Sequence, residues 1–158
     1  MTEAKTTTKS RSGGDKTANV WTDEERAAMQ ASARERKTAS RRSPADERAE
    51  GERDVRAKIA DMPDADRAMG ERIHALVSET APDLVPRTYY GMPAYSRDGK
   101  VICFFKAASK FKVRYATFEF QPDAGLDDGD MWPVSFAVTK LTPAVEARIA
   151  ELVKRAVS

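Results

Sequence analysis

An Asp-Gly pair beside a strand-like run is the feature that most limits how this 158-residue chain folds. Asp98 and Gly99 are followed by residues 101–105, a continuous apolar run of the kind found in strands buried on both faces. An Asp-Gly pair is the usual signal of a tight hairpin turn, because both positions tolerate a positive φ. The segments on either side of this turn are therefore expected to form neighbouring antiparallel strands.

Further strands are expected after this hairpin. Residues 111–115 alternate apolar and basic side chains, which predicts a half-buried strand. The alternation changes phase at Ala116, so we expect a bulge or bend near Ala116 or Thr117. Residues 121–130 are acidic and irregular, and residues 134–138 alternate again as a last strand.

Helical patterns lie on both sides of the strands. Apolar residues recur at helical spacing from residue 46 to 62 and again from 64 to 80, where Pro82 ends the pattern. A third pattern follows Thr142 and Pro143, which suit the cap and first turn of a helix. Helices, then successive strands, then a helix predict an α+β domain of two layers, an antiparallel sheet with helices packed on one face.

The first 44 residues differ from the rest in charge. They hold ten Lys and Arg against six Asp and Glu, whereas residues 45–158 hold seventeen against nineteen. We expect residues 1–44 to be a flexible basic arm and residues 45–158 to be the folded domain. Within the arm, Thr22 and Glu25 form a capping box that starts a helix at 23–37, with Trp21 before it. Its apolar side is mostly alanine, so packing is expected to add little.

The apolar content and the cysteine count also bear on the cellular location of the protein. No run approaches the roughly 18 apolar residues of a membrane span, and no apolar block follows the N-terminal lysines as in a secretory signal. The single cysteine, Cys103, excludes an internal disulfide and fits a reducing cytoplasm. The chain is expected to be a cytoplasmic monomer or homodimer with no membrane partner.

A tyrosine-rich stretch is the best candidate for a binding surface. Residues 87–95 contain three tyrosines, together with a glycine and a proline that change the direction of the backbone. The tyrosine side chains on either side of this change can therefore face a common hollow. The alternative is that the same rings belong to the core. The candidate ligand-binding residues are Tyr90, Met92, Pro93 and Tyr95, with Trp132 as further aromatic surface and Lys106, Lys112 and Arg114 to fix an anionic group.

An acidic loop offers a weaker, metal-binding hypothesis. Asp127, Asp128 and Asp130 lie within four residues and carry oxygen ligands suited to a hard metal ion. Their spacing is not that of an EF-hand, and a solvated acidic loop is the plainer interpretation.

The sequence offers few candidates for a catalytic nucleophile or base. His74 is the only histidine and flanks the apolar stripe of its helix, and Cys103 lies inside the most apolar run, where a thiol is inert. There is no Gly-rich phosphate loop, so no enzyme activity is predicted. Nucleic-acid binding is not favoured either, because the body is not basic and has no recognition motif.

Residues from about 53 to 157 resemble the YdhG-like domain family of small bacterial proteins. The resemblance is carried by the helix end at 79–83, the Tyr-Gly-Met-Pro-Ala-Tyr run at 90–95, the turn at 98–100 and the strand at 101–105. It implies a secretion-chaperone-like α+β fold, a cytoplasmic location and a relation to a frataxin-like iron chaperone. Iron is thus a cofactor suggested by resemblance alone.

Taken together, the residues favour a non-catalytic intracellular protein that binds a small molecule or a metal ion, with iron carriage as the implied role. The alternative is a module that binds a protein or nucleic acid through its basic N-terminal arm.

Overall fold

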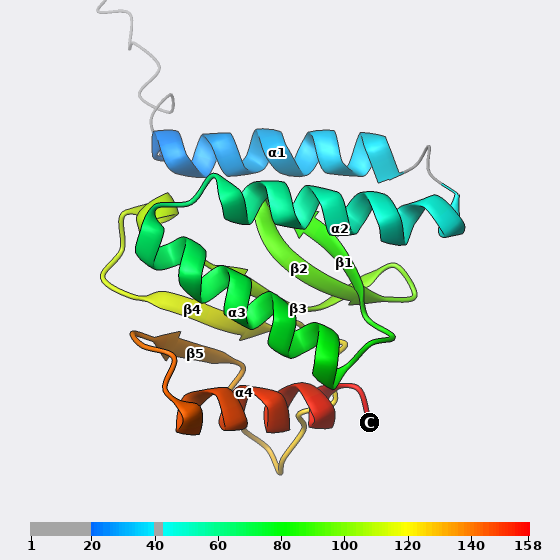
Figure 1. Ribbon diagram of the computed structural model, residues 1–158, viewed down its shortest axis with the longest axis vertical. Helices are drawn as coiled ribbons and strands as arrows, with labels where there is room; N and C mark the ends of the chain where they lie inside the picture. Colours follow the sequence, from blue (N-terminus) through cyan, green and yellow to red (C-terminus); the bar gives the residue numbers. More distant parts are fainter. Residues whose placement is uncertain (1–19, 40–42) are drawn as a thin grey trace, which may run out of the picture.

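The structure is a computed structural model that describes residues 20–39 and 43–158. Its elements follow the predicted order of helices, strands and a final helix (Figure 1). The helices are α1 (Asp23–Ala39), α2 (Pro44–Ala60), α3 (Asp64–Thr80) and α4 (Pro143–Ala156), with a short 3₁₀ helix η1 (Ser109–Phe111). The strands are β1 (Val85–Tyr89), β2 (Met92–Arg97), β3 (Lys100–Lys106), β4 (Ala116–Phe120) and β5 (Ser135–Val138).

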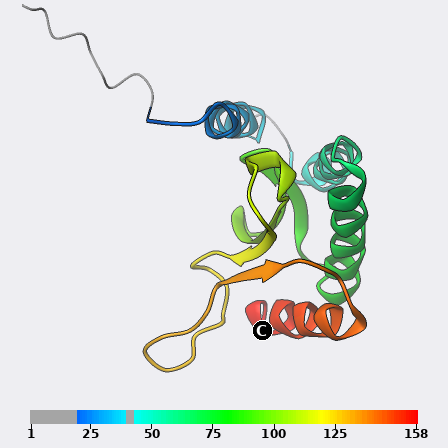
Figure 2. The ribbon, with the colours of Figure 1, turned by 90° about the vertical axis from the view of Figure 1, so that its left-hand side faces the viewer.

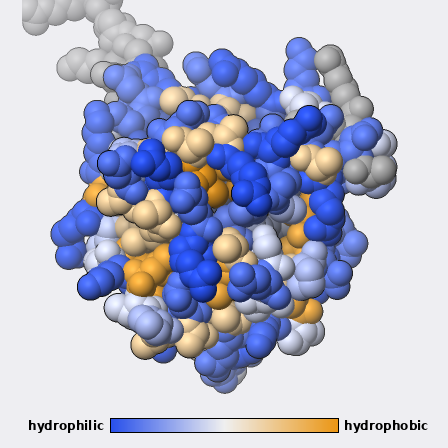
Figure 3. Space-filling model, in the orientation of Figure 1, coloured by the Kyte–Doolittle hydropathy of each residue, from blue (hydrophilic) through white to orange (hydrophobic). Residues whose placement is uncertain are grey.

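The five strands form one antiparallel sheet in the order β1-β2-β3-β4-β5. Helices α2, α3 and α4 lie on one side of it, whereas α1 stands apart from α3 and α4, at the end of the sheet near β1 (Figure 2). The predicted two-layer α+β fold is confirmed. Hydrophilic side chains cover most of the face seen in Figure 3, where α2 and α3 are in front, and hydrophobic ones form smaller patches between them. None of the described helices is long and apolar enough to cross a membrane.

Two tight turns shape the first three strands. Asp98 and Gly99 have φ values of 53° and 78°, and they join β2 to β3 as the Asp-Gly signal predicts. Tyr90 and Gly91, with φ values of 50° and 74°, join β1 to β2 in the same way. Positive φ is uncommon for tyrosine, so contacts around this turn must hold it in place.

The strands separate two apolar clusters. The main core lies between the sheet and α3 and α4, and its most deeply buried large side chains include Ile73, Tyr95, Phe105 and Phe118. A smaller cluster centres on Met92, Ala94 and Phe104, with four partly buried neighbours: Tyr89, Tyr90, Val101 and Phe111. Because successive side chains of a strand point to opposite faces, Met92 and Ala94 belong to one face of the sheet and Tyr95 to the other.

The helix ends follow the sequence signals. Thr22 and Glu25 form the predicted capping box: the Thr22 amide donates to Glu25 Oε2 at 2.8 Å and the Glu25 amide donates to Thr22 Oγ1 at 3.1 Å. Thr142 Oγ1 accepts from the Val145 amide at the start of α4, and Pro143 follows it. The helix predicted at 23–37 is present as α1, and it buries Ala28 and Ser32. Ser40, Arg41 and Arg42, and residues 1–19 of the arm, lie outside the described residues.

Helix α2 lies very close to β1. At Gly51 a Cβ atom would be 1.9 Å from the Pro86 carbonyl oxygen, so only glycine fits there. Arg48, one turn earlier, donates from its guanidinium to the carbonyl oxygens of Pro82, Asp83 and Leu84. Together these contacts fasten α2 to the segment that leads from α3 into the sheet.

Two local predictions were wrong. Residues 111–115 are not a strand: η1 ends at Phe111, Lys112 has a φ of 52°, and the next strand starts at Ala116. A left-handed residue turns the chain and ends the extended geometry that the alternating pattern suggested. The bulge expected near Ala116 or Thr117 is also absent, because β4 pairs in unbroken register with both neighbours; the register shift lies between Tyr95 and Ser96.

Candidate functional site

A groove lies between α1 and the smaller apolar cluster of the sheet. It encloses about 240 Å³, and residues of both the N-terminal part of α1 and the strands form its walls. We refer to it as the α1 groove, lined by Trp21, Glu25, Ala28, Met29, Tyr90, Met92, Phe104, Lys106, Phe111 and Glu119. Most of this lining is aromatic or apolar, with three charged side chains among it. Such a composition is typical of small-molecule sites.

Glu35 of α1 holds the Tyr90–Gly91 turn that forms one end of the groove. Its carboxylate accepts from the Tyr90 amide at 2.9 Å and from the Gly91 amide at 2.8 Å. Lys110 Nζ donates to the Tyr90 carbonyl at 3.1 Å from the opposite side. A Cβ atom on Gly91 would lie 2.3 Å from Lys110 Nζ and 3.5 Å from Ala31 Cβ, so α1, the turn and η1 meet closely here. These contacts explain how Tyr90 keeps its positive φ.

The Lys110 ammonium is expected to lose its proton near pH 8. Burial lowers its pKa to about 8, the Lys58 charge adds to this, and Glu35 opposes it. Because the pKa in the folded state lies below the ordinary value of 10.5, this group makes the fold more stable as the pH rises between the two values. A titration of the lysine ¹³Cε resonances measures the pKa, and Lys110→Met identifies the signal. Glu35→Gln should lower the pKa further; a Lys110 signal that titrates with ordinary lysines would contradict the burial.

The structure brings three of the predicted ligand-binding residues together. Tyr90, Met92 and Lys106 all line the α1 groove. Pro93 and Tyr95 do not: both are among the fully buried side chains, and Tyr95 belongs to the main core on the other face of the sheet. For Tyr95 the core interpretation of the tyrosine-rich stretch therefore applies.

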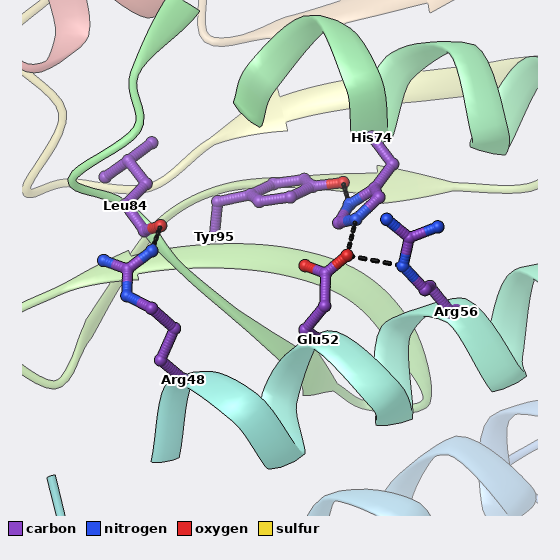
Figure 4. Close-up of polar contacts among 6 residues, drawn as sticks. All are labelled: Arg48, Glu52, Arg56, His74, Leu84 and Tyr95. Atoms are coloured by element: carbon purple, nitrogen blue, oxygen red, sulfur yellow. Dashed lines mark hydrogen bonds and ion pairs between the residues drawn. The ribbon is translucent and has the colours of Figure 1, made fainter. Parts of the chain in front are cut away.

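Tyr95 belongs to a polar chain, buried at its Tyr95–His74 end and exposed at Arg56, that the sequence did not reveal. Its hydroxyl lies 3.0 Å from His74 Nδ1, and His74 Nε2 lies 2.8 Å from Glu52 Oε1, which also accepts from Arg56 Nε at 2.6 Å (Figure 4). Burial raises the pKa of Tyr95 well above its ordinary value, so the hydroxyl keeps its proton. In the neutral imidazole whose Nε2–H donates to the Glu52 carboxylate, Nδ1 accepts a hydrogen bond from this hydroxyl. The chain joins α2, α3 and β2, and both imidazole nitrogens are occupied in it.

Glu52 keeps its charge within this chain. Burial raises its pKa, but hydrogen bonds and charges from His74 and Arg56 outweigh burial, and the net pKa is lowered. Cys103, the other group weighed for catalysis, is buried in the main core, where burial raises the pKa of the thiol. Neither His74 nor Cys103 lines the α1 groove.

The remaining predicted cations lie outside the groove. Lys112 is exposed and its Nζ pairs with Glu24 of α1 at 2.5 Å. Arg114 is also exposed, with its guanidinium carbon 5.0 Å from the centre of the Tyr115 ring. Lys106 alone of the three proposed anion-binding cations therefore lines the groove.

Trp132 lies in a different hollow, with two of the proposed metal ligands. A cavity of about 450 Å³ is lined by Trp132, Asp127 and Asp130, among others, in the long loop between β4 and β5. Asp128 is exposed and does not line it. Within residues 20–39 and 43–158 no group of three or more His, Cys, Asp or Glu side chains is placed to hold a metal ion. The metal hypothesis for this loop thus has no geometric support.

Sequence reasoning missed most of the groove lining and its support at Glu35. Phe104 and Phe111 were assigned only to strands, and Glu35 and Trp21 only to the N-terminal arm. Trp21 carried a usable signal, because a lone large aromatic beside a capping box indicates a helix that packs against something. The contact of Glu35 with a turn 55 residues away in sequence had no local signal.

Comparison with known proteins gives no further guide: no family model, no curated protein and no solved structure matches this chain.

Proposed function

We propose that this protein is a non-catalytic binding protein that holds a small, largely apolar ligand in the α1 groove. The observation that carries the proposal is the convergence of aromatic and methionine side chains from α1 and from the sheet on one cavity of about 240 Å³. Sites for drug-sized molecules are usually about 300–1,000 Å³. The groove is slightly smaller than this range and therefore suits a ligand of up to about three rings.

The side chains around the groove support a role in binding rather than in catalysis. The described lining residues include no histidine, cysteine or serine, and the groups weighed for catalysis lie in the core. The described lining residues that could act as nucleophile or base are Glu25, Tyr90, Lys106 and Glu119, and no hydrogen bond joins any two of them, whereas covalent catalysis usually needs a nucleophile and a base within hydrogen-bond reach. The single buried cysteine and the YdhG-like resemblance support a cytoplasmic place as part of the proposal.

Replacing Phe111 by alanine is expected to weaken ligand binding about tenfold or more, because it removes one half-buried aromatic wall of the groove. The probe is N-phenyl-1-naphthylamine, an uncharged apolar dye whose fluorescence rises when it leaves water. Titration of the full chain with this dye measures the dissociation constant.

Phe136→Ala is the matched control, since Phe136 is also half-buried but does not line the groove. It should leave the dissociation constant unchanged. Absence of dye binding to the wild type, or equal loss in both variants, would refute the groove as the ligand site.

A further inference from the structure

Building on the proposed function, we propose that the ligand of the α1 groove is an organic cation, with an alkylated ammonium or amine group held between the aromatic walls. The inference reverses the expectation from sequence, which assigned an anionic group to Lys106, Lys112 and Arg114. It follows from the kinds of rings in the lining and from the balance of charge around them.

Four aromatic side chains line the groove: Trp21, Tyr90, Phe104 and Phe111. They come from the start of α1, the β1–β2 turn, β3 and η1, so they surround the space from several sides. The face of an aromatic ring carries negative charge, and several such faces around one space form the usual cage for quaternary ammonium groups. Trp21 remains 55% exposed, which leaves its ring available to a ligand.

An ammonium group of the protein already uses one of these rings. Lys106 Nζ lies 4.7 Å from the centre of the Phe111 ring, within the range of a cation–π contact. Among the described residues no carboxylate forms an ion pair with Lys106. Lys106 therefore occupies a position that a ligand cation could take over.

The charges that line the groove also favour a cation. Glu25, Glu119 and Lys106 together give a formal charge of −1. Each carboxylate accepts one hydrogen bond from its own segment, Glu25 from the Thr22 amide and Glu119 from the Thr117 hydroxyl. Neither carboxylate forms an ion pair with a described residue.

Among the charges outside the lining, Lys110 Nζ lies 5.7 Å from the centre of the Phe111 ring. Lys112 is paired with Glu24, and the charge of Lys110 is opposed by that of Glu35. An anionic ligand would meet two carboxylates for one lysine. A cationic ligand would meet aromatic faces and a net negative lining.

Two isosteric probes test the inference: the (4-hydroxyphenyl)trimethylammonium cation and its uncharged counterpart 4-tert-butylphenol. They have nearly the same shape, so a difference in affinity reports the charge. The anion 4-hydroxybenzenesulfonate is the third arm. Calorimetric titration of the full chain at neutral pH should show the ammonium binding about tenfold more tightly than 4-tert-butylphenol.

Removing a positive charge from the lining and removing a negative one should change the affinity for the ammonium probe in opposite directions. Lys106→Met removes the nearer of the two ammonium groups over the Phe111 ring, Lys110 being the other at 5.7 Å. It also removes a positive charge from the lining, so it should tighten ammonium binding by about fivefold. Glu119→Gln should weaken it by about two- to fivefold. Lys140→Met, at an exposed lysine outside the groove, is the matched control and should change nothing.

The outcomes separate this inference from the proposed function. If 4-tert-butylphenol binds as tightly as the ammonium, or the sulfonate binds best, the groove is a ligand site but not one for cations. If no probe binds and N-phenyl-1-naphthylamine does not bind either, both proposals fail. An unchanged or weaker ammonium affinity in Lys106→Met would also overturn the cation assignment.

Discussion

Replacing Gly51 by alanine is expected to destabilise the protein by about 3 kcal/mol. The new Cβ atom would lie 1.9 Å from the Pro86 carbonyl oxygen, a backbone atom that cannot rotate away. Helix α2 would have to move away from β1 and loosen the contacts of both. The higher helix propensity of alanine offsets only about 1 kcal/mol of this loss of stability. For a chain of this size the melting temperature should fall by roughly 6–12 °C, measured by thermal unfolding followed by circular dichroism.

Gly70→Ala is the matched control in the neighbouring helix. A Cβ atom at Gly70 would meet only side-chain atoms of Ile59 and Met62, all 3.4 Å away. That variant should be neutral or stabilised by up to about 1 kcal/mol, because alanine favours the helix. If Gly51→Ala proves as stable as Gly70→Ala, α2 does not lie on β1 as closely as described.

Tyr95→Phe is expected to lower the free energy of unfolding by about 1–3 kcal/mol. The substitution keeps the ring in the core but removes the hydroxyl that lies 3.0 Å from His74 Nδ1. The imidazole is buried, and its Nδ1 would be left without a protein partner. Urea unfolding of wild type and variant gives the difference.

Tyr89→Phe is the control for the loss of a hydroxyl. Tyr89 is only half-buried, and no described residue forms a hydrogen bond with its hydroxyl. Its variant should differ from wild type by less than about 0.5 kcal/mol. Equal losses in the two variants would show that the His74 contact adds nothing to the stability.

The order of elements and their ends could be predicted because local signals set them. Thr22 with Glu25, Asp98 with Gly99, and Thr142 each specify a cap or turn through atoms only a few residues away. These interactions need no knowledge of the rest of the fold.

Composition could not predict which side chains of the tyrosine-rich stretch face the main core and which face the α1 groove. Whether a side chain faces the main core or the α1 groove depends on the residue at which the β1–β2 turn falls, since strand side chains alternate. With Tyr90 and Gly91 in the turn, Met92 faces the groove and Tyr95 faces the core. A turn one residue later would have exchanged them.

The candidate site was only partly predictable for a second reason: it is assembled across long stretches of sequence. Tyr90 and Phe104 share the groove with Trp21, but Trp132, equally aromatic, lies in another cavity. Residue type alone does not distinguish the aromatic residues of the groove from Trp132. The strand misassigned at 111–115 hid Phe111 for the same reason, because its side chain reaches the groove from a 3₁₀ turn.

The attachment of α1 to the sheet has a thermodynamic consequence. One wall of the groove belongs to a helix that Glu35 fastens to two backbone amides, and the other wall belongs to the sheet. A molecule that touches both walls binds only the form in which the helix is in place, so its binding energy adds to that of the Glu35 contact. Occupancy and helix docking are therefore linked equilibria: a bound ligand stabilises the docked helix, and a change that undocks the helix weakens ligand binding.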